Sequence, residues 1–170
     1  MHKVYLKAAN KIAFISKNAD STFWDEVWEK DLVHRIPDNY KSDWLFCPVA
    51  SKYLPKKAKI LEGGCGNGHV VFALNKQGYK PLGVDFAERT IKKIKKLYPE
   101  LVFELGDVRD LKYKANSFDG YISAGVIEHF PGGYAKILNE IKRVVKPGGY
   151  IFVTFPHLSL LRRLKIKLNK

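Results

Sequence analysis

The sequence is poor in cysteine and contains no long apolar run. Its two cysteines, Cys47 and Cys65, form neither a Cys-x-x-Cys pair nor a metal-binding spacing. This excludes a disulfide-stapled secreted scaffold and a cysteine zinc site, and we expect no bound metal. No apolar run is long enough to cross a bilayer, and lysines interrupt the first residues. We therefore expect no signal peptide and a soluble, cytoplasmic protein.

Acidic residues are also scarce relative to basic ones. Thirty Lys and Arg against 17 Asp and Glu leave a formal net charge of +13. Such an excess suits nucleic acid or an anionic membrane surface as a partner. However, the aromatic residues do not interleave with the basic runs, as a base-stacking platform would require. We therefore favour a solvated basic surface and do not expect nucleic acid as a partner.

What the sequence does contain is a glycine-rich stretch at residues 59–72, KILEGGCGNGHVVF. An apolar run, a turn and the apolar start of a helix predict a buried strand that leads through a tight turn into a helix. Glu62 falls at the carboxyl end of this strand, where open α/β sheets bind their ligands. Gly64, Gly66 and Gly68 give the spacing G-x-G-x-G. Dinucleotide sites want G-x-G-x-x-G, and His69 stands where its last glycine would be.

This stretch resembles motif I of the class I S-adenosylmethionine (SAM) dependent methyltransferases, (D/E)-x-G-x-G-x-G. Glu62, Gly64, Gly66 and Gly68 match the motif position for position. The resemblance implies SAM as the cofactor, with Glu62 at the amino group of its methionine moiety and the glycines beneath that moiety. The alternative is a strand-to-helix turn that binds nothing.

Two acids at later strand ends extend the resemblance. Asp85 ends an expected strand at 80–86, and in the family this position binds the ribose hydroxyls; Phe86, next to it, is included in the expected site. The alternative for Asp85 is a helix N-cap. Asp107 follows a strand at 101–105, where the resemblance implies contact with the adenine amino group, and the backbone N–H of Val108 would meet the ring. The alternative for Asp107 is a turn aspartate.

The end of the fourth expected strand carries the candidate catalytic residue. The resemblance places Ala124 and the segment after it at the methyl-donor end of the pocket. Methyl transfer from a sulfonium needs positioned reactants and excluded water, and a base only where the acceptor must lose a proton. His129, beside Glu128, is the candidate base, because histidine titrates near neutrality. The alternative is that this pair only shapes the loop.

Four strand–helix alternations predict an α/β fold, a Rossmann-like three-layer sandwich with a parallel sheet. The resemblance covers residues 58–155, is nearest to the small-molecule, ubiquinone-type branch, and implies the strand order 3-2-1-4-5. The fifth strand is expected at 150–155, after a stop at the Lys-Pro-Gly-Gly segment 146–149. The family's sixth and seventh strands are not expected here, because too few residues follow the fifth strand. We expect a helical cap or lid at 1–55, a SAM-binding domain at 56–156 and a basic amphipathic helix at 157–170.

The N-terminal part allows two interpretations. Residues 1–19 form an extended arm or a short helix. A helix capped by Ser21 or Thr22 then carries an aromatic face, which covers the core or forms a lid over the cleft. The resemblance implies a SAM-dependent methyltransferase, which we expect to act on a small-molecule or lipid-like acceptor. The C-terminal helix could contact a membrane surface, and a second copy could cover the fifth strand as a homodimer.

Two alternatives to this function stay open. The chain could be a non-catalytic or truncated SAM-binding module, because the last family strands are not expected. It could also be a nucleic-acid methyltransferase. The sequence disfavours the latter, since no Asn-Pro-Pro motif follows the fourth strand, where residues 123–126 read SAGV.

Overall fold

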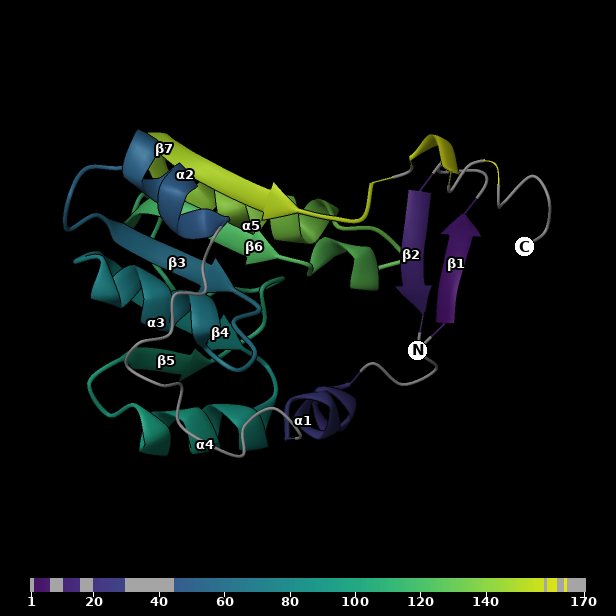
Figure 1. The fold of residues 1–170 in the computed structure, drawn as a ribbon, viewed down its shortest axis with the longest axis horizontal. Helices are drawn as coiled ribbons and strands as arrows, with labels where there is room; N and C mark the ends of the chain where they lie inside the picture. The colour runs from purple at the N-terminus through teal and green to yellow at the C-terminus, as the bar shows by residue number, and fades with distance from the viewer. Residues whose placement is uncertain are drawn as a thin grey trace.

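A five-stranded parallel sheet forms the centre of the computed structural model, which describes residues 2–6, 11–15, 20–29, 45–157, 159–161 and 164. The strands lie in the order β5-β4-β3-β6-β7 (Figure 1). Numbered from the first strand of this sheet, the order is 3-2-1-4-5, which confirms the prediction. The strands are β3 (Lys59–Gly63), β4 (Lys80–Asp85), β5 (Val102–Leu105), β6 (Phe118–Ala124) and β7 (Val145–Thr154).

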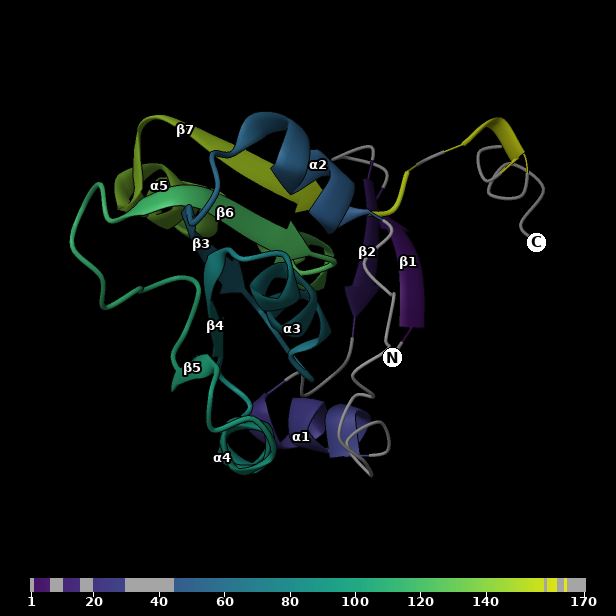
Figure 2. The same ribbon diagram turned by 60° about the vertical axis from the view of Figure 1, so that its left-hand side comes forward.

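Helices cover both faces of the sheet, as the three-layer prediction required. In the two ribbon views α2 and α3 lie on one face and α5 on the other (Figures 1 and 2). Their sequences are amphipathic: α5 buries Ile137, Ile141 and Val144, one residue per helical turn. The helices are α2 (Phe46–Tyr53), α3 (His69–Lys76), α4 (Glu88–Leu97) and α5 (Ala135–Val144), with a short 3₁₀ turn η2 (Ile127–His129).

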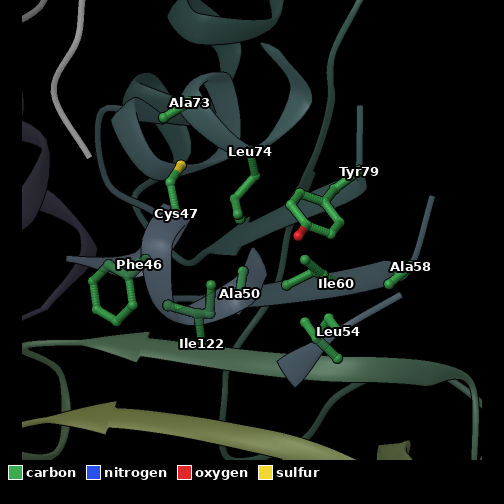
Figure 3. Close-up of a cluster of buried hydrophobic side chains, with 10 residues drawn as sticks. All are labelled: Phe46, Cys47, Ala50, Leu54, Ala58, Ile60, Ala73, Leu74, Tyr79 and Ile122. Atoms are coloured by element: carbon green, nitrogen blue, oxygen red, sulfur yellow. The ribbon is translucent and has the colours of Figure 1, made fainter. Parts of the chain in front are cut away.

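The central strand β3 divides the hydrophobic core, because successive side chains of a strand point to opposite faces. Ile60 packs in the cluster drawn in Figure 3, under α2 and α3. Leu61 packs on the other face, against Tyr121 and α5. Both side chains are fully buried, and the burial of each contributes about 1.5–3 kcal/mol to the stability of the fold. A third cluster joins α3 and α4 through Phe72, Ile91 and Phe103.

The N-terminal part lies at the carboxyl end of the sheet (Figures 1 and 2). The strands β1 (His2–Leu6) and β2 (Lys11–Ile15) pair antiparallel, and β2 packs beside η2. The expected helical cap at 1–55 therefore also contains a two-stranded sheet. Helix α1 (Ser21–Glu29) is capped by Asp20, whose Oδ1 accepts the N–H of Phe23 at 3.0 Å, rather than by Ser21 or Thr22. Residues 30–44, part of the helices expected there, lie outside the described residues.

The fifth strand of the sheet begins earlier than the sequence suggested. Strand β7 starts at Val145, directly after α5, whereas a loop was expected up to Gly149. The pairing with β6 shifts register between Phe118 and Gly120, and Gly148 has a φ of +77°. The Lys-Pro-Gly-Gly segment is thus absorbed as an irregularity within the strand.

Most of the expected C-terminal helix, residues 158, 162–163 and 165–170, lies outside the described residues. The part of the chain that is described holds no helix both long and apolar enough to span a membrane. The cysteines, both within that part, are not bridged to each other. Cys47 lies in the cluster of Figure 3, and Cys65 in the cluster formed with α4.

Candidate cofactor site

A cavity of about 320 Å³ opens at the carboxyl ends of the sheet strands. The predicted site residues line it, apart from Gly66 and Gly68, which belong to the glycine turn beside it. The structure thus brings together side chains that follow four different strands. The predicted residues on its walls are Glu62, Gly64, Asp85, Phe86, Asp107, Val108, Ala124 and His129.

The glycine turn takes a conformation that requires glycine. Gly64, Gly66 and Gly68 have φ values of +77°, +49° and +79°, the left-handed region that other residues rarely adopt. A Cβ would also collide with a different neighbour at each position. It would lie 2.5 Å from Val126 at Gly64, 2.6 Å from Trp28 at Gly66 and 2.8 Å from Phe103 at Gly68. The bare backbone therefore lets three elements close tightly around the turn.

Two buried carboxylates flank this turn. Glu62 is 3% exposed at the end of β3, and Asp85 is 5% exposed at the end of β4. Asp85 Oδ2 accepts the N–H of Gly66 at 2.9 Å, and Oδ1 accepts the N–H of Ala87 at 3.0 Å. Burial raises the pKa of Asp85, against the opposing effect of these hydrogen bonds. Helix α4 starts at Glu88 after its N-cap Ala87, so Asp85 ties two loops together and does not occupy the N-cap position.

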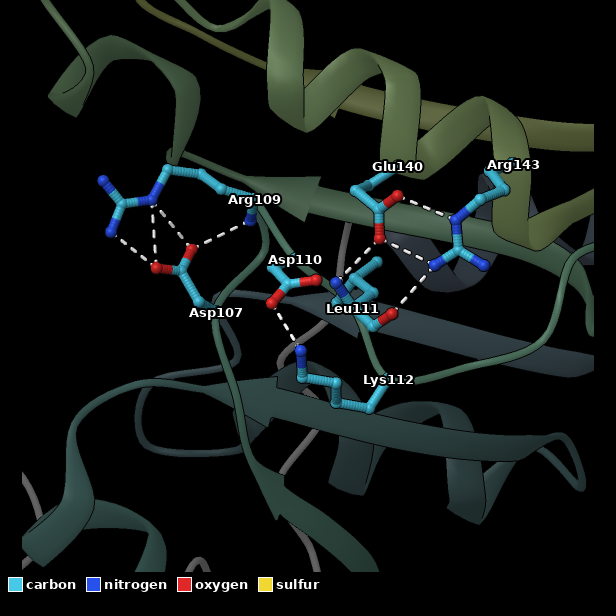
Figure 4. Close-up of polar contacts among 7 residues, drawn as sticks. All are labelled: Asp107, Arg109, Asp110, Leu111, Lys112, Glu140 and Arg143. Carbon is cyan, nitrogen blue, oxygen red and sulfur yellow. Dashed lines mark hydrogen bonds and ion pairs between the residues drawn. The ribbon is translucent and has the colours of Figure 1, made fainter.

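The third acid, Asp107, is held by an arginine that the motif analysis did not identify. Arg109 Nε lies 2.9 and 3.0 Å from the two oxygens of Asp107, and its Nη2 lies 2.5 Å from Oδ2 (Figure 4). Although burial raises the pKa of Asp107, the hydrogen bonds from Arg109 bring it below its usual value. The backbone N–H of Arg109 also bonds Asp107, at 2.8 Å, as a turn aspartate would. The guanidinium lies 5.4 Å from the ring centre of Phe130.

The loop that carries Asp107 is fastened to α5 farther along. Arg143 donates to the carbonyl of Leu111 at 2.8 Å, and Glu140 accepts the N–H of Leu111 at 2.7 Å (Figure 4). Arg143 also donates to the carbonyl of Tyr113 at 2.6 Å. Arg143 and Glu140 are themselves paired at 2.7 Å. These bonds satisfy backbone groups that a loop would otherwise leave to water. These bonds hold the loop after β5, which forms one wall of the cavity, against helix α5.

Helix α1 forms the roof of the cavity, which we define as Trp24 and Trp28. The two rings stack, with centroids 6.2 Å apart and planes 24° apart. Trp28 lies over Gly66, and Trp24 meets the ring of His129 edge-on at 4.8 Å. Both tryptophans line the cavity. The helical spacing of these aromatics predicted one face, and the structure directs that face at the site.

Beyond the predicted set, the walls contain residues with no motif of their own. Asn67 and His69 belong to the turn and the start of α3, and Val126 follows β6. Beside His129, burial raises the pKa of Glu128. The arrangement offers carboxylates for cationic and hydroxyl groups and an aromatic cover on one side of the cavity. Among the described residues no cluster of His, Cys, Asp and Glu is arranged to hold a metal ion.

Comparison with known proteins places this site in a family. The methyltransferase domain family matches residues 61–153. A ubiquinone biosynthesis O-methyltransferase of Leptothrix cholodnii is 29% identical over 138 residues, covering 78% of this chain and 57% of that protein. A tRNA (carboxymethyluridine(34)-5-O)-methyltransferase of Arabidopsis thaliana is 31% identical over 136 residues, covering 74% and 33%. The chain thus spans only part of the length of these curated relatives.

A solved structure supports the same placement. The TehB-like SAM-dependent methyltransferase of Corynebacterium glutamicum is 28% identical, with a TM-score of 0.60 over 78% of this chain and 71% of that one. The matched family region contains the cavity walls from Glu62 to Phe130 and the sheet from β4 to β6. The chain therefore belongs to the methyltransferase domain family, within the class I SAM-dependent methyltransferases.

Proposed function

We propose that this chain binds SAM in the cavity and transfers its methyl group to a small-molecule or lipid-like acceptor. The observation that carries the proposal is the convergence of Glu62, Asp85 and Asp107 on one cavity beside the glycine turn. These acids lie at or just after the carboxyl ends of three neighbouring strands of the sheet, β3, β4 and β5. A ligand that reaches all three needs a cationic or hydrogen-bond-donating group at each of three places, as SAM has.

The residues present fit the cofactor. Bare glycine backbone at the turn leaves room for the methionine moiety, and Glu62 would hold its amino group. The oxygens of Asp85 would accept hydrogen bonds from the ribose hydroxyls, and Asp107 would accept one from the adenine amino group. When bound, SAM supplies a methyl group on a positively charged sulfur. The chain's own contribution is to position both reactants and to exclude water under the roof of Trp24 and Trp28.

His129 is placed to serve as a base for acceptors that must lose a proton. Its ring lines the cavity at the end of β6, on the side where the resemblance puts the donor methyl. Trp24 packs edge-on against this ring and fixes its position. In this role an imidazole nitrogen takes the acceptor's proton as the methyl is transferred, which contributes typically 10²–10⁴-fold in rate.

The walls near His129 favour a small, apolar acceptor. Ala124, Val126, Phe130 and Trp24 line the cavity in this region. The relatives act on both kinds of acceptor, by their names, and the net charge of +13 suits RNA. An RNA acceptor is therefore the competing outcome of the test.

The test has two stages. Calorimetric titration with the product S-adenosylhomocysteine should give micromolar binding that Asp85→Ala abolishes. No binding by the folded chain, or unchanged affinity in the variant, would contradict the proposed site. Radiolabelled SAM is then offered with a catechol, a membrane lipid extract or total tRNA. Label in the catechol or in the lipid extract supports the proposal. Label only in tRNA would contradict it and identify RNA as the acceptor. Binding without transfer to any of them would indicate a non-catalytic module.

A further inference from the structure

We propose that Asp25 is a positioning residue for the cofactor cavity: its carboxylate anchors α1 to the N-terminus of α4 and so holds the roof over the glycine turn. The inference rests on the proposed cofactor site. Asp25 belongs to none of the cofactor motifs, and it does not line the cavity. It acts through Trp24, its neighbour in sequence, and Trp28, which lies almost one helical turn later.

The carboxylate of Asp25 is buried, with 4% of the residue exposed, and accepts four hydrogen bonds from α4. Oδ1 accepts the backbone N–H of Thr90 at 2.8 Å and its hydroxyl at 2.8 Å. Oδ2 accepts the backbone N–H of Arg89 at 3.2 Å and its Nε–H at 3.4 Å. Although burial raises the pKa of Asp25, these bonds bring it below its usual value, which keeps the group charged near neutral pH.

These bonds replace a helix cap that α4 lacks in its own sequence. The first N–H groups of a helix have no partner within it, and the N-cap side chain commonly accepts one of them. The N-cap of α4 is Ala87, which has no side-chain oxygen. Helix α1 supplies the acceptors instead, because Ser21 Oγ also accepts the N–H of Glu88 at 3.3 Å. The negative charge of Asp25 also interacts favourably with the positive end of the α4 helix dipole.

The same helix sets the height of the roof. Trp28 sits where a Cβ on Gly66 would come within 2.6 Å of its ring, so the ring and the turn are in close contact. Trp24 stacks on Trp28 and reaches His129. Helix α4 is held to the sheet separately, by Ile91 and Ile94. Loss of the Asp25 anchor should therefore loosen the roof and leave the sheet and α4 in place.

The first experiment compares Asp25→Asn with Glu26→Gln. In Asp25→Asn, the asparagine puts an NH₂ group among the hydrogen-bond donors of Arg89 and Thr90. Glu26 is exposed on the same helix, and Glu26→Gln removes the same charge without touching these donors. Calorimetry with S-adenosylhomocysteine should show about tenfold weaker binding for Asp25→Asn and wild-type binding for Glu26→Gln. Equal affinity in Asp25→Asn and wild type would overturn the inference. A wild-type chain that does not bind would instead contradict the proposed function.

A double-mutant cycle separates positioning from a general loss of stability. If Asp25 acts through the roof, Asp25→Asn should weaken binding in the wild type but add almost nothing in a Trp28→Leu background. Independent, multiplying losses would overturn the inference. Should Asp25→Asn not fold, Thr90→Val removes one donor to Asp25 and keeps the side-chain shape, and Thr90→Ser keeps the hydroxyl. Binding a few-fold weaker in Thr90→Val alone supports the anchor, and equal binding in both opposes it.

Discussion

Replacing Gly66 with alanine tests how tightly the glycine turn and the roof fit together. Two penalties act at this position. A φ of +49° places alanine in the left-handed region, at a cost of about 1–2 kcal/mol. The new Cβ would also lie 2.6 Å from Cε2 and Cζ2 of Trp28, and overpacking of this kind costs about 1–3 kcal/mol. The sum predicts that Gly66→Ala lowers the free energy of unfolding by roughly 2–5 kcal/mol.

Gly78 supplies the matched control. Its φ is +84°, and a Cβ there would have nothing within 4 Å. Gly78→Ala should therefore carry only the backbone penalty, about 1–2 kcal/mol. The difference between the two variants isolates the contact with Trp28. Urea unfolding followed by circular dichroism measures both values under identical conditions.

The two variants should also separate in ligand binding. Gly66 donates its N–H to Asp85 at 2.9 Å. A displaced turn therefore also displaces Asp85, the residue expected to bind the ribose. Gly66→Ala should bind S-adenosylhomocysteine at least tenfold more weakly than wild type, and Gly78→Ala should bind it normally. Equal losses of stability and unchanged binding in both variants would refute the packing argument, because the contact with Trp28 would then contribute nothing.

Three further predictions follow from the cavity walls. Asp85→Asn leaves one acceptor oxygen for two backbone donors, so we expect S-adenosylhomocysteine binding to weaken tenfold or more in calorimetry; wild-type affinity would refute the ribose role. Gly64→Ala should lose binding because its Cβ would lie 2.5 Å from Val126, and a second change, Val126→Ala, should restore part of it. The hydrogen bonds from Arg143 hold the pKa of Glu140 below its usual value. The pair therefore stabilises the fold at pH values above the usual pKa of glutamate. This stabilisation is lost as the pH falls through the lowered pKa of Glu140. Glu140→Gln should therefore be about 1–3 kcal/mol less stable than wild type at pH 7, and urea titrations at successively lower pH should show this difference shrinking below the usual pKa of glutamate.

Local patterns in the sequence predicted most of the central sheet. The apolar run before the glycine turn, the acids at or just after the ends of β3, β4 and β5, and the spacing of buried residues in α4 and α5 are signals within a few residues of one another. The strand order came from the resemblance to methyltransferases, since no local pattern specifies which strands are neighbours. The early start of β7 was missed because Lys-Pro-Gly-Gly reads as a turn, whereas the sheet absorbs it as an irregularity.

The parts of the site that sequence reasoning missed depend on contacts between distant residues. Asp25 and Thr90 are separated by 65 positions, so no spacing rule connects them. The face of Trp24 and Trp28 was visible as a helical pattern, but the pattern does not say what the face covers. The pairing of β1 with β2 was not foreseen, because an isolated two-stranded sheet is marginal by itself and forms where packing supports it. Arg109 had no signal beyond being a charged residue two positions after an acid.

The two backbone hydrogen bonds to Asp85 have a consequence for which sugars the cavity can select. They fix both χ angles of the side chain before any ligand arrives, so binding need not immobilise it, which avoids about 0.5–1.5 kcal/mol of ordering entropy. Each oxygen keeps a second lone pair, and the two are held at the spacing of one carboxylate. A vicinal diol would meet both at once, whereas a deoxy sugar would leave one oxygen with its backbone hydrogen bond alone and its second lone pair unused. For the proposed cofactor site, this rigidity predicts a preference for ribose over deoxyribose.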